Sequence, residues 1–493
     1  MLDMERLLPA QSRAKTVQDH IDELPMWVDG TLLSAPPMTR MQWRIWSLAA
    51  AGKFFTGFIL FMTGVALPLF FNEFEIRPAA HGVISAATLF GIFVGAFFFG
   101  GLADRLGRKP IFVAEMIILI AFLIALTLSS SFWLVVICLF GVGLPLGSAY
   151  PTASTVIAEN IPTAHRGRLV LAAYAFQAVG ALAGTAVGYL VLAALPTIQA
   201  WRWMYAAAII PAVLVAIGRL YVVESANWLS SQGEIDKAER AARQLLVRQP
   251  QYPTKIKIIP HDIQAADAHA KQSYAALFTK ANRRATTLAS VPWLLQDLGS
   301  YGIGIFTPTI LVAVVGGSAD HARSITDLIL NDITAAKGAA LTTTLLIVGV
   351  LVAVLLTDTV GRIALQVLGF FGCAAGLFLA ALSLNFTDGR ELSWIFAGFM
   401  LFNFMTSMGP SAQTHLLAVE VFPTKIRGKG AGFAAAVGKI GAVATAFLFP
   451  VLLDTIGTQP LLFGLVGSSI LGAVVTWLFR IETTGVSLDK LEH

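Results

Sequence analysis

Two charged motifs occur twice in this chain, and every copy stands between long apolar runs. The segment Gly101–Pro110 shares the pattern Asp-x-x-Gly-Arg with Asp358–Arg362. The segments Glu159–Gly167 and Glu420–Gly428 agree at every Glu, Pro, Thr, Arg and Gly. The two motifs recur in the same order, at offsets of about 254 and about 261 residues. The chain therefore consists of two related halves, and duplicated halves in a membrane protein favour a transporter.

The amino-acid composition indicates that most of the chain lies within a lipid bilayer. Of the 493 residues, 56% are hydrophobic and only 13% are charged, whereas about one quarter of a soluble domain is charged. The net charge of +5 does not indicate nucleic-acid binding, because its Lys and Arg residues lie in separate short loops rather than on one basic face. Cys138 and Cys373 lie in apolar runs of opposite halves, so neither a disulfide nor a metal site is expected.

Long apolar runs predict an all-α membrane protein, because a chain in lipid must satisfy its backbone hydrogen bonds within each helix. Each half holds six such runs, and the expected fold is two pseudo-symmetric six-helix bundles. The predicted spans are 47–71, 82–102, 111–130, 132–158, 168–195, 203–223, 287–315, 338–357, 364–384, 392–418, 430–453 and 461–480.

The remaining segments are polar. The predicted organisation is a tail at 1–44, a first bundle at 45–223, a linker at 224–285, a second bundle at 286–481 and a tail at 482–493. The first tail holds one short amphipathic stretch, Thr16–Leu24, and the linker holds another, Glu234–Arg248. No cleavable signal is expected, since the first forty residues lack an apolar core.

Basic residues predict the orientation of the spans. Arg105, Arg108, Lys109 and Arg362 occupy loops on one side, together with the basic linker. Because loops rich in Lys and Arg face the cytoplasm, both termini are expected there. The predicted location is a bacterial inner membrane, crossed many times.

The loop Gly101–Pro110 resembles the signature loop of the major facilitator superfamily, between its second and third helices. With the echo at Asp358–Arg362, the resemblance extends from about residue 45 to 485. The paired Glu-x-x-Pro-Thr-x-x-Arg-Gly loops and the tail Glu482–Gly485 are most similar to the sugar-porter and metabolite-proton symporter branch. The resemblance implies the twelve-helix fold of that superfamily and transport by alternating access.

The chain departs from that branch at three places. Val223–Leu229 replaces a Pro-Glu-Ser-Pro-Arg motif, and Leu295–Tyr301 replaces the usual glutamine pair of helix seven. Helix one lacks the Asp-x-x-Asp of many symporters and reads Phe55–Ile59 instead. Neither hexose specificity nor the usual proton site is therefore implied.

The repeated motifs supply candidates for a gate. Asp104 and Arg108 are four residues apart, so they are neighbours on one helical face. The resemblance implies that such charges latch the two bundles together on the cytoplasmic side, whereas ordinary basic anchoring of loops is the alternative. The expected gate residues are Asp104, Arg108, Glu159 with Arg166, Asp358, Arg362, and Glu420 with Arg427.

Breaks at related positions predict a central cavity. Gly143–Pro145 with Pro151 and Gly409–Pro410 should interrupt helices four and ten, and broken helices line substrate sites in transporters. Each polar side chain near them has a plainer role as a bond between helices. The candidate substrate-binding residues are Lys53, Tyr150, Gln177, Gln296, Tyr301, Asn403, Ser407, Gln413 and Lys439.

Charges inside the spans are costly, at about 2.5–3.5 kcal/mol each near a helix centre. Asp297 is the candidate proton carrier, because helix one has no acid. Its alternative role is a buried pair with a lysine that only holds the bundles together. Lys53 has the alternative of reaching back to the interface, and Glu115 is expected to reach the interface from the end of its helix.

These patterns predict a proton-coupled symporter that takes up a small organic solute, either anionic, since Lys53 and Lys439 are available, or sugar-like. The alternatives are a proton-coupled exporter of a metabolite or drug, and a membrane receptor that signals through 224–285. No enzymatic activity, cofactor or metal is expected. The expected partners are the solute, protons and lipid, with a monomer as the working unit and no nucleic acid.

Overall fold

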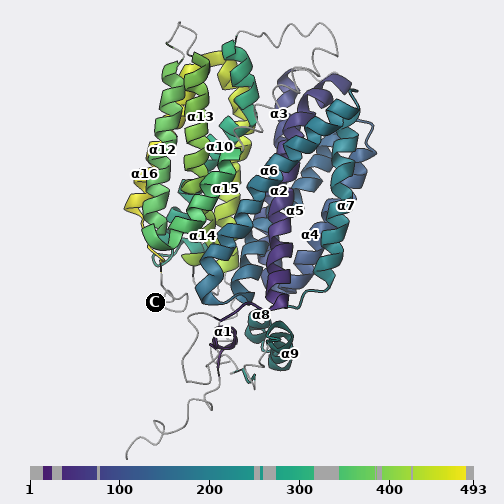
Figure 1. Cartoon of the computed structure of the whole chain (residues 1–493), viewed down its shortest axis with the longest axis vertical. Coiled ribbons are helices and arrows are strands. Elements are labelled where there is room, and N and C mark those ends of the chain that lie inside the picture. The colour runs from purple at the N-terminus through teal and green to yellow at the C-terminus, as the bar shows by residue number, and fades with distance from the viewer. Residues whose placement is uncertain are drawn as a thin grey trace, which may run out of the picture.

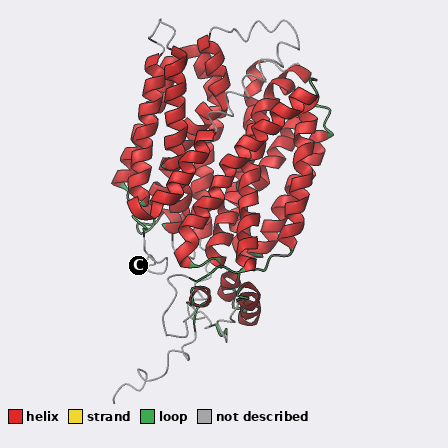
Figure 2. Cartoon of the chain, viewed as in Figure 1, coloured by secondary structure: helices red, strands yellow, loops and turns green. Residues whose placement is uncertain are grey.

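The computed structural model describes residues 15–24, 36–74, 78–248, 256–258, 274–315, 344–383, 385, 391–422 and 426–484. Side chains are described throughout these ranges except at 78–81, 304–315, 391–392, 427, 450 and 454. Within them the chain is almost wholly helical and forms two upright bundles that stand side by side (Figures 1 and 2). The expected all-α architecture is confirmed.

Each half of the chain builds one bundle. The first contains α2 (Arg40–Glu73), α3 (Pro78–Leu106), α4 (Arg108–Thr127), α5 (Phe132–Asn160), α6 (Thr163–Ala194) and α7 (Ala200–Leu220). The second contains α10 (Arg283–Val315), a helix at Thr344–Val360, α12 (Arg362–Ser383), α13 (Glu391–Met408), α14 (Pro410–Glu420), α15 (Arg427–Ile456) and α16 (Thr458–Leu478). Beneath them lie α1 (Val17–Ile21), α8 (Ala226–Ser231) and α9 (Ile235–Leu245), and the 3-10 helix η3 (Tyr274–Phe278) precedes α10.

Nine of the described helices are long and apolar enough to cross a membrane: α2 to α7, α12, α15 and α16. The other three predicted spans correspond to α10, to the shorter helix Thr344–Val360 and to α13 followed by α14. The predicted positions are therefore filled by helices, although α2 begins at Arg40, before the predicted boundary at residue 45.

Only one of the two predicted helix breaks is present. α13 and α14 meet at Gly409, whose φ of −110° and ψ of −95° end one helix before Pro410 begins the next. By contrast, α5 runs unbroken through Pro145 and Pro151, so the expected interruption of helix four is wrong. Neighbouring helices and hydroxyl side chains can satisfy the backbone groups that a proline leaves free in a membrane bundle.

The polar segments fold against the first bundle. α1 and α9 lie where the amphipathic stretches predicted short helices. Asp22 accepts hydrogen bonds from the backbone nitrogen and the hydroxyl of Thr163, at 2.7 and 2.6 Å, and so caps the first turn of α6. Arg248 donates to the Ile21 carbonyl at 2.7 Å. This part of the tail is a packed element rather than a free end.

Small residues bring helices into backbone contact, as Gly180, Gly184 and Gly188 of α6 show against α2. A Cβ on Gly180 would lie 2.0 Å from the Phe54 carbonyl oxygen of α2. Between the bundles, a Cβ on Gly432 of α15 would lie 3.0 Å from the Ala96 carbonyl oxygen of α3. Close approach through small residues is the usual route to stable helix pairing in lipid.

Replacing Gly57 with alanine should destabilise the first bundle. A Cβ there would lie 1.8 Å from the Gln177 carbonyl oxygen, so α2 and α6 must separate, at a cost of about 1–3 kcal/mol. Gly64, on the same helix, is the matched control, because no described atom lies within 4 Å of its Cβ position. Thermal unfolding in detergent should show a lower midpoint for Gly57→Ala alone. Equal midpoints for the two variants would contradict this packing.

Candidate functional site

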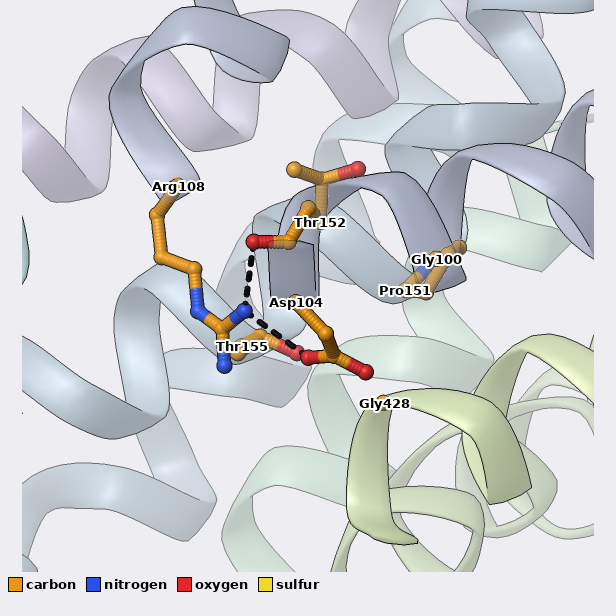
Figure 3. A pocket seen from close by; sticks show the side chains of 8 residues that line it. Gly100, Asp104, Arg108, Pro151, Thr152, Thr155 and Gly428 are labelled. Atoms are coloured by element: carbon orange, nitrogen blue, oxygen red, sulfur yellow. Dashed lines mark hydrogen bonds and ion pairs between the residues drawn. The ribbon is translucent and has the colours of Figure 1, made fainter. Parts of the chain in front are cut away.

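The first repeated loop forms a charged cluster that we call the first gate: Asp104, Arg108, Glu159, Glu224 and Ser225. Arg108 donates from Nη1 to Asp104 Oδ1 at 2.8 Å and from Nη2 to Glu159 Oε1 at 2.9 Å. Figure 3 shows the bond of Arg108 to Asp104, and Arg108 Nη1 also donates to the Ala103 carbonyl at 2.7 Å. The arginine, at the start of α4, thus joins the end of α3 to the end of α5. The expected contact with Asp104 is present, but the two residues do not share one helical face, because Gly107 separates α3 from α4.

Glu224 completes this gate from beyond α7. Its carboxylate accepts the backbone nitrogens of Arg108 and Lys109 at 3.0 and 3.1 Å, which are free donors at the start of α4. The next residue, Ser225, donates to Glu159 Oε2 at 2.5 Å. The sequence reading placed both residues in a linker and assigned them no role.

The second gate repeats this arrangement with Asp358, Arg362, Glu420, Glu482 and Thr483. Arg362 lies 3.1 Å from Asp358 and 3.4 Å from Glu420. Glu482 accepts the backbone nitrogens of Arg362 and Ile363, each at 3.2 Å, and Thr483 donates to Glu420 at 2.5 Å. The two copies of the sequence motifs therefore form the same set of ion pairs and hydrogen bonds.

Glu482 lies beyond the last helix, in the segment read as a tail. Partial burial alone would raise the pKa of this carboxyl. Hydrogen bonds from the Thr484 hydroxyl and from the amides of Ile363 and Arg362 outweigh that effect and hold the pKa of Glu482 below its ordinary value. The carboxylate is therefore held in its charged form at the start of α12.

The expected pairing within the second motif differs from the observed one. We expected Glu159 to pair with Arg166, whereas the structure pairs it with Arg108, and the charge of Arg166 acts on Glu420 of the other bundle. The side chain of Arg427, the expected partner of Glu420, lies outside the described residues.

Each gate also faces the opposite bundle. Arg168 of α6 donates to Asp358 Oδ2 at 3.0 Å. Asp104 lies against the start of α15, where a Cβ on Gly428 would be 2.8 Å from its Oδ1. A small pocket beside Asp104 is shown in Figure 3 and is lined by Gly100, Ala103, Asp104, Arg108, Pro151, Thr152, Thr155 and Gly428. Both clusters thus contact the opposite bundle at this end.

Three buried charges meet midway along the bundles. Lys439 of α15 donates to Asp297 Oδ2 of α10 at 2.6 Å and to the Tyr301 hydroxyl at 3.0 Å. Both helices belong to the second bundle, so this pair does not hold the two bundles to each other. That part of the alternative reading of Asp297 is wrong.

Lys53 of α2 approaches the same place from the first bundle. Its side chain is buried, and Nζ lies 4.1 Å from the centre of the Tyr150 ring without any hydrogen-bond partner. Lys439 Nζ lies 4.9 Å from the same ring, and Gln177 donates to the Tyr150 hydroxyl at 3.4 Å. Lys53 therefore does not reach back to the interface, and Tyr150 is the centre of the group.

Three aromatic residues of this region were not foreseen. The ring of His415, on α14, packs 4.3 Å from Tyr174 and 4.5 Å from Trp293, measured between ring centres. A histidine just after the Gly409–Pro410 break was the available signal, because titratable residues within spans mark functional sites.

The remaining candidates have other partners within the second bundle. Gln296 donates to Ser300 at 2.6 Å, and Ser300 bonds to Thr406. Gln413 accepts from Thr357 of the helix Thr344–Val360. Ser407 faces that helix as well, since its Cβ would lie 3.0 Å from one on Gly349, and Asn403 is buried on α13.

Glu115 does not reach the interface, and that expectation is wrong. It is fully buried and lies 2.9 Å from Arg219 of α7. Ser148 and Thr152 donate to its other oxygen at 2.5 and 2.6 Å. Its partner Arg219 belongs to α7, so the position of Glu115 near the start of α4 did not predict where its side chain lies.

The sequence model of the family described as sugar (and other) transporter matches residues 45–493. The chain belongs to this family. It is accordingly a multi-pass membrane transporter rather than an enzyme, and the resemblance carried by the repeated loops is confirmed.

Individual relatives are similar along most of their length. The inner membrane metabolite transport protein YgcS of Escherichia coli is 29% identical, over 92% of this chain and 94% of its own. The glucose transporter GlcP of Staphylococcus epidermidis is 26% identical, over 92% and 98%. The structure of the proton:xylose symporter XylE bound to 6-bromo-6-deoxy-D-glucose has a TM-score of 0.76 at 19% identity, covering 92% of this chain and 98% of that one.

Asp104→Asn should slow transport without weakening substrate binding. The change removes the charge that faces Arg108 and the start of α15, so the closed state of this end loses stability and is regained more slowly. The maximal rate in proteoliposomes should fall about tenfold, equivalent to about 1.4 kcal/mol, with KM nearly constant.

The neighbouring Arg105→Ala is the matched control, since Arg105 is exposed. Asp358→Asn should produce a milder form of the same defect. A normal maximal rate in Asp104→Asn protein at equal reconstitution would mean that the loop only anchors the chain in the membrane.

Proposed function

We propose that this transporter takes up a small organic anion together with a proton. The observation that carries the proposal is the ammonium group of Lys53, which is buried between helices with no acceptor. A buried charge is stable only when it is paired or hydrogen bonded. A carboxylate of the substrate would provide the missing partner.

The charge balance of the cluster supports an anion. Lys53 and Lys439 supply two positive charges, and Asp297 supplies one negative charge, which Lys439 already holds. The pair Glu115 and Arg219 is neutral in sum. One substrate carboxylate would therefore give Lys53 a partner, whereas a neutral solute would leave Lys53 unpaired.

Asp297 provides a route for proton coupling. When a proton binds to Asp297, its attraction for Lys439 falls, and Lys439 is released toward the anion beside Tyr150. Substrate and proton then enter as a neutral pair, so the net charge of the site is the same in the empty and in the loaded protein. Departure of the anion returns Lys439 to Asp297, and the proton leaves.

The position of the lysines connects binding to alternating access. Lys53 belongs to the first bundle and Lys439 to the second, so an anion held between them would draw the bundles together. The gates at one end would then open and close as the bundles rock. XylE, whose structure is similar to that of this chain, is a proton:xylose symporter.

The proposed orientation places the gates, α1, α8 and α9 in the cytoplasm of a bacterial cell, with both termini there. Arg105, Arg108, Arg168 and Lys429 gather at that end, as cytoplasmic loops do. The proposed working unit is a monomer. Export in exchange for protons, or signalling without transport, would instead appear as efflux or as no flux in proteoliposomes under an imposed pH gradient.

Asp297→Asn should abolish accumulation but keep exchange. The amide cannot carry the proton, whereas counterflow of labelled substrate needs no net proton movement. Asp236→Asn is the matched control, because Asp236 is an exposed carboxylate on α9. Proton-driven accumulation at the normal rate in folded Asp297→Asn protein would place the coupling site elsewhere.

Lys53→Met should weaken anion binding about tenfold to a hundredfold, because hydrogen bonds to charged groups contribute about 1.5–3 kcal/mol. The same change removes an unpaired buried charge, so the ligand-free protein should unfold at an equal or higher temperature. The exposed Lys280→Met is the control. Normal anion affinity in Lys53→Met protein would contradict the proposed role.

A further inference from the structure

We infer that the anion is a hydroxylated carboxylate of the sugar-acid kind, with hydroxyl groups that bind in the same site as its carboxylate. This inference rests on the proposed function and specifies its substrate. It follows from the buried polar atoms around Tyr150 that have no hydrogen-bond partner.

Four such atoms are contributed by both bundles: Lys53 Nζ, Gln177 Oε1, Trp293 Nε1 and His415 Nε2. Lys53, Trp293 and His415 are exposed by only 3%, 2% and 6%. Buried polar groups are nearly always hydrogen bonded in folded proteins. We therefore expect the substrate of this transporter to carry polar groups that hydrogen bond to these four buried atoms.

These residues share one neighbour. The ring of Tyr150 lies 4.1 Å from Lys53 Nζ, 5.4 Å from the His415 ring and 6.1 Å from the Trp293 ring, each measured to the ring centre. Gln177 donates to its hydroxyl. A single small molecule beside Tyr150 is thus within reach of groups from α2, α6, α10 and α14.

His415 requires a donor from the ligand. Its Nδ1 lies 2.7 Å from the Ser411 carbonyl oxygen, which has no proton to give, so Nδ1 carries the hydrogen. The ring packs on Tyr150, whose face also meets the ammonium groups of Lys53 and Lys439, and we take the ring of His415 as neutral. In the neutral ring Nε2 is an acceptor, and it must receive an O–H or N–H group.

Lys53 and Trp293 have the opposite requirement, because an ammonium and an indole N–H only donate. They call for a carboxylate or another acceptor. Gln177 accommodates a hydroxyl in either orientation of its amide, since a hydroxyl both donates and accepts. The site therefore needs an anionic acceptor and at least one hydroxyl donor in one molecule.

Simpler ligands leave part of this set unpaired. An alkanoate satisfies Lys53 but offers no donor to His415, and a neutral sugar satisfies His415 but leaves the charge of Lys53. An aromatic acid adds a ring where Tyr174 and Trp293 already pack on His415. A hydroxy acid satisfies both kinds of group.

Three six-carbon probes test the inference on purified full-length protein: D-gluconate, hexanoate and D-glucose. The expected result, from thermal shift and from competition for uptake, is that D-gluconate binds at least about tenfold more tightly than either of the others, because sites built around hydroxyl groups reject analogues that lack them. Glycerate, propionate and glycerol repeat the comparison for a shorter chain.

His415→Phe keeps a planar ring but removes Nε2. It should reduce the affinity for D-gluconate to that for hexanoate and leave hexanoate unchanged, whereas the control His165→Phe should change neither. Unfolding of the ligand-free variants confirms that both are folded. Retained preference for D-gluconate in folded His415→Phe protein would overturn the assignment of the hydroxyl to His415.

The outcomes of these experiments distinguish a failure of this inference from a failure of the proposed anion transport. Equal binding of hexanoate and D-gluconate, still dependent on Lys53, would overturn the hydroxyl requirement and leave anion transport intact. Preference for D-glucose would overturn both. No stabilisation by either hydroxy acid would also overturn the inference. Proton coupling is measured independently by Asp297→Asn.

Discussion

The unequal number of positive and negative charges at the centre of the bundles is the constraint on which the account depends. Lys439 is satisfied by Asp297, at 2.6 Å, whereas Lys53 has only the face of Tyr150. A cation on an aromatic face gains about 2 kcal/mol when desolvated, less than a buried ammonium loses by leaving water. The protein therefore retains an ammonium group without a hydrogen-bond partner in the place where we propose that the substrate binds.

The two gates differ from the central site in that their charged groups have partners. Every carboxylate in them is hydrogen bonded or ion paired, and each gate contains an arginine, three carboxylates and a hydroxyl from four separate parts of the chain. Exposed ion pairs are weak, at about 0–1 kcal/mol, which suits contacts such as Arg168 with Asp358 that must break in each cycle. Strong pairing within a bundle and weak pairing between bundles allow the bundles to move as units.

The duplicated motifs predicted where both charged clusters lie. The four-residue spacing predicted the contact of Asp104 with Arg108, although these residues lie on α3 and α4 rather than on one helix. Charges in apolar runs likewise marked Lys53 and Asp297 as unusual. Sequence spacing failed where the partner arrives from a distant helix. Glu224 caps a helix that begins over a hundred residues earlier, and Glu115 meets Arg219 across the bundle. Such pairings depend on helix packing, which periodicity alone does not specify.

Proton uptake on substrate binding tests the central claim most directly. Calorimetric titration of the purified protein with the transported anion, in buffers of different ionisation enthalpy, counts the protons taken up per site. The account predicts uptake approaching one proton in the wild type and none in Asp297→Asn protein, with affinity that falls as pH rises. Anion binding without proton uptake, at a pH where Asp297 is charged, would contradict the claim that substrate and proton share this site.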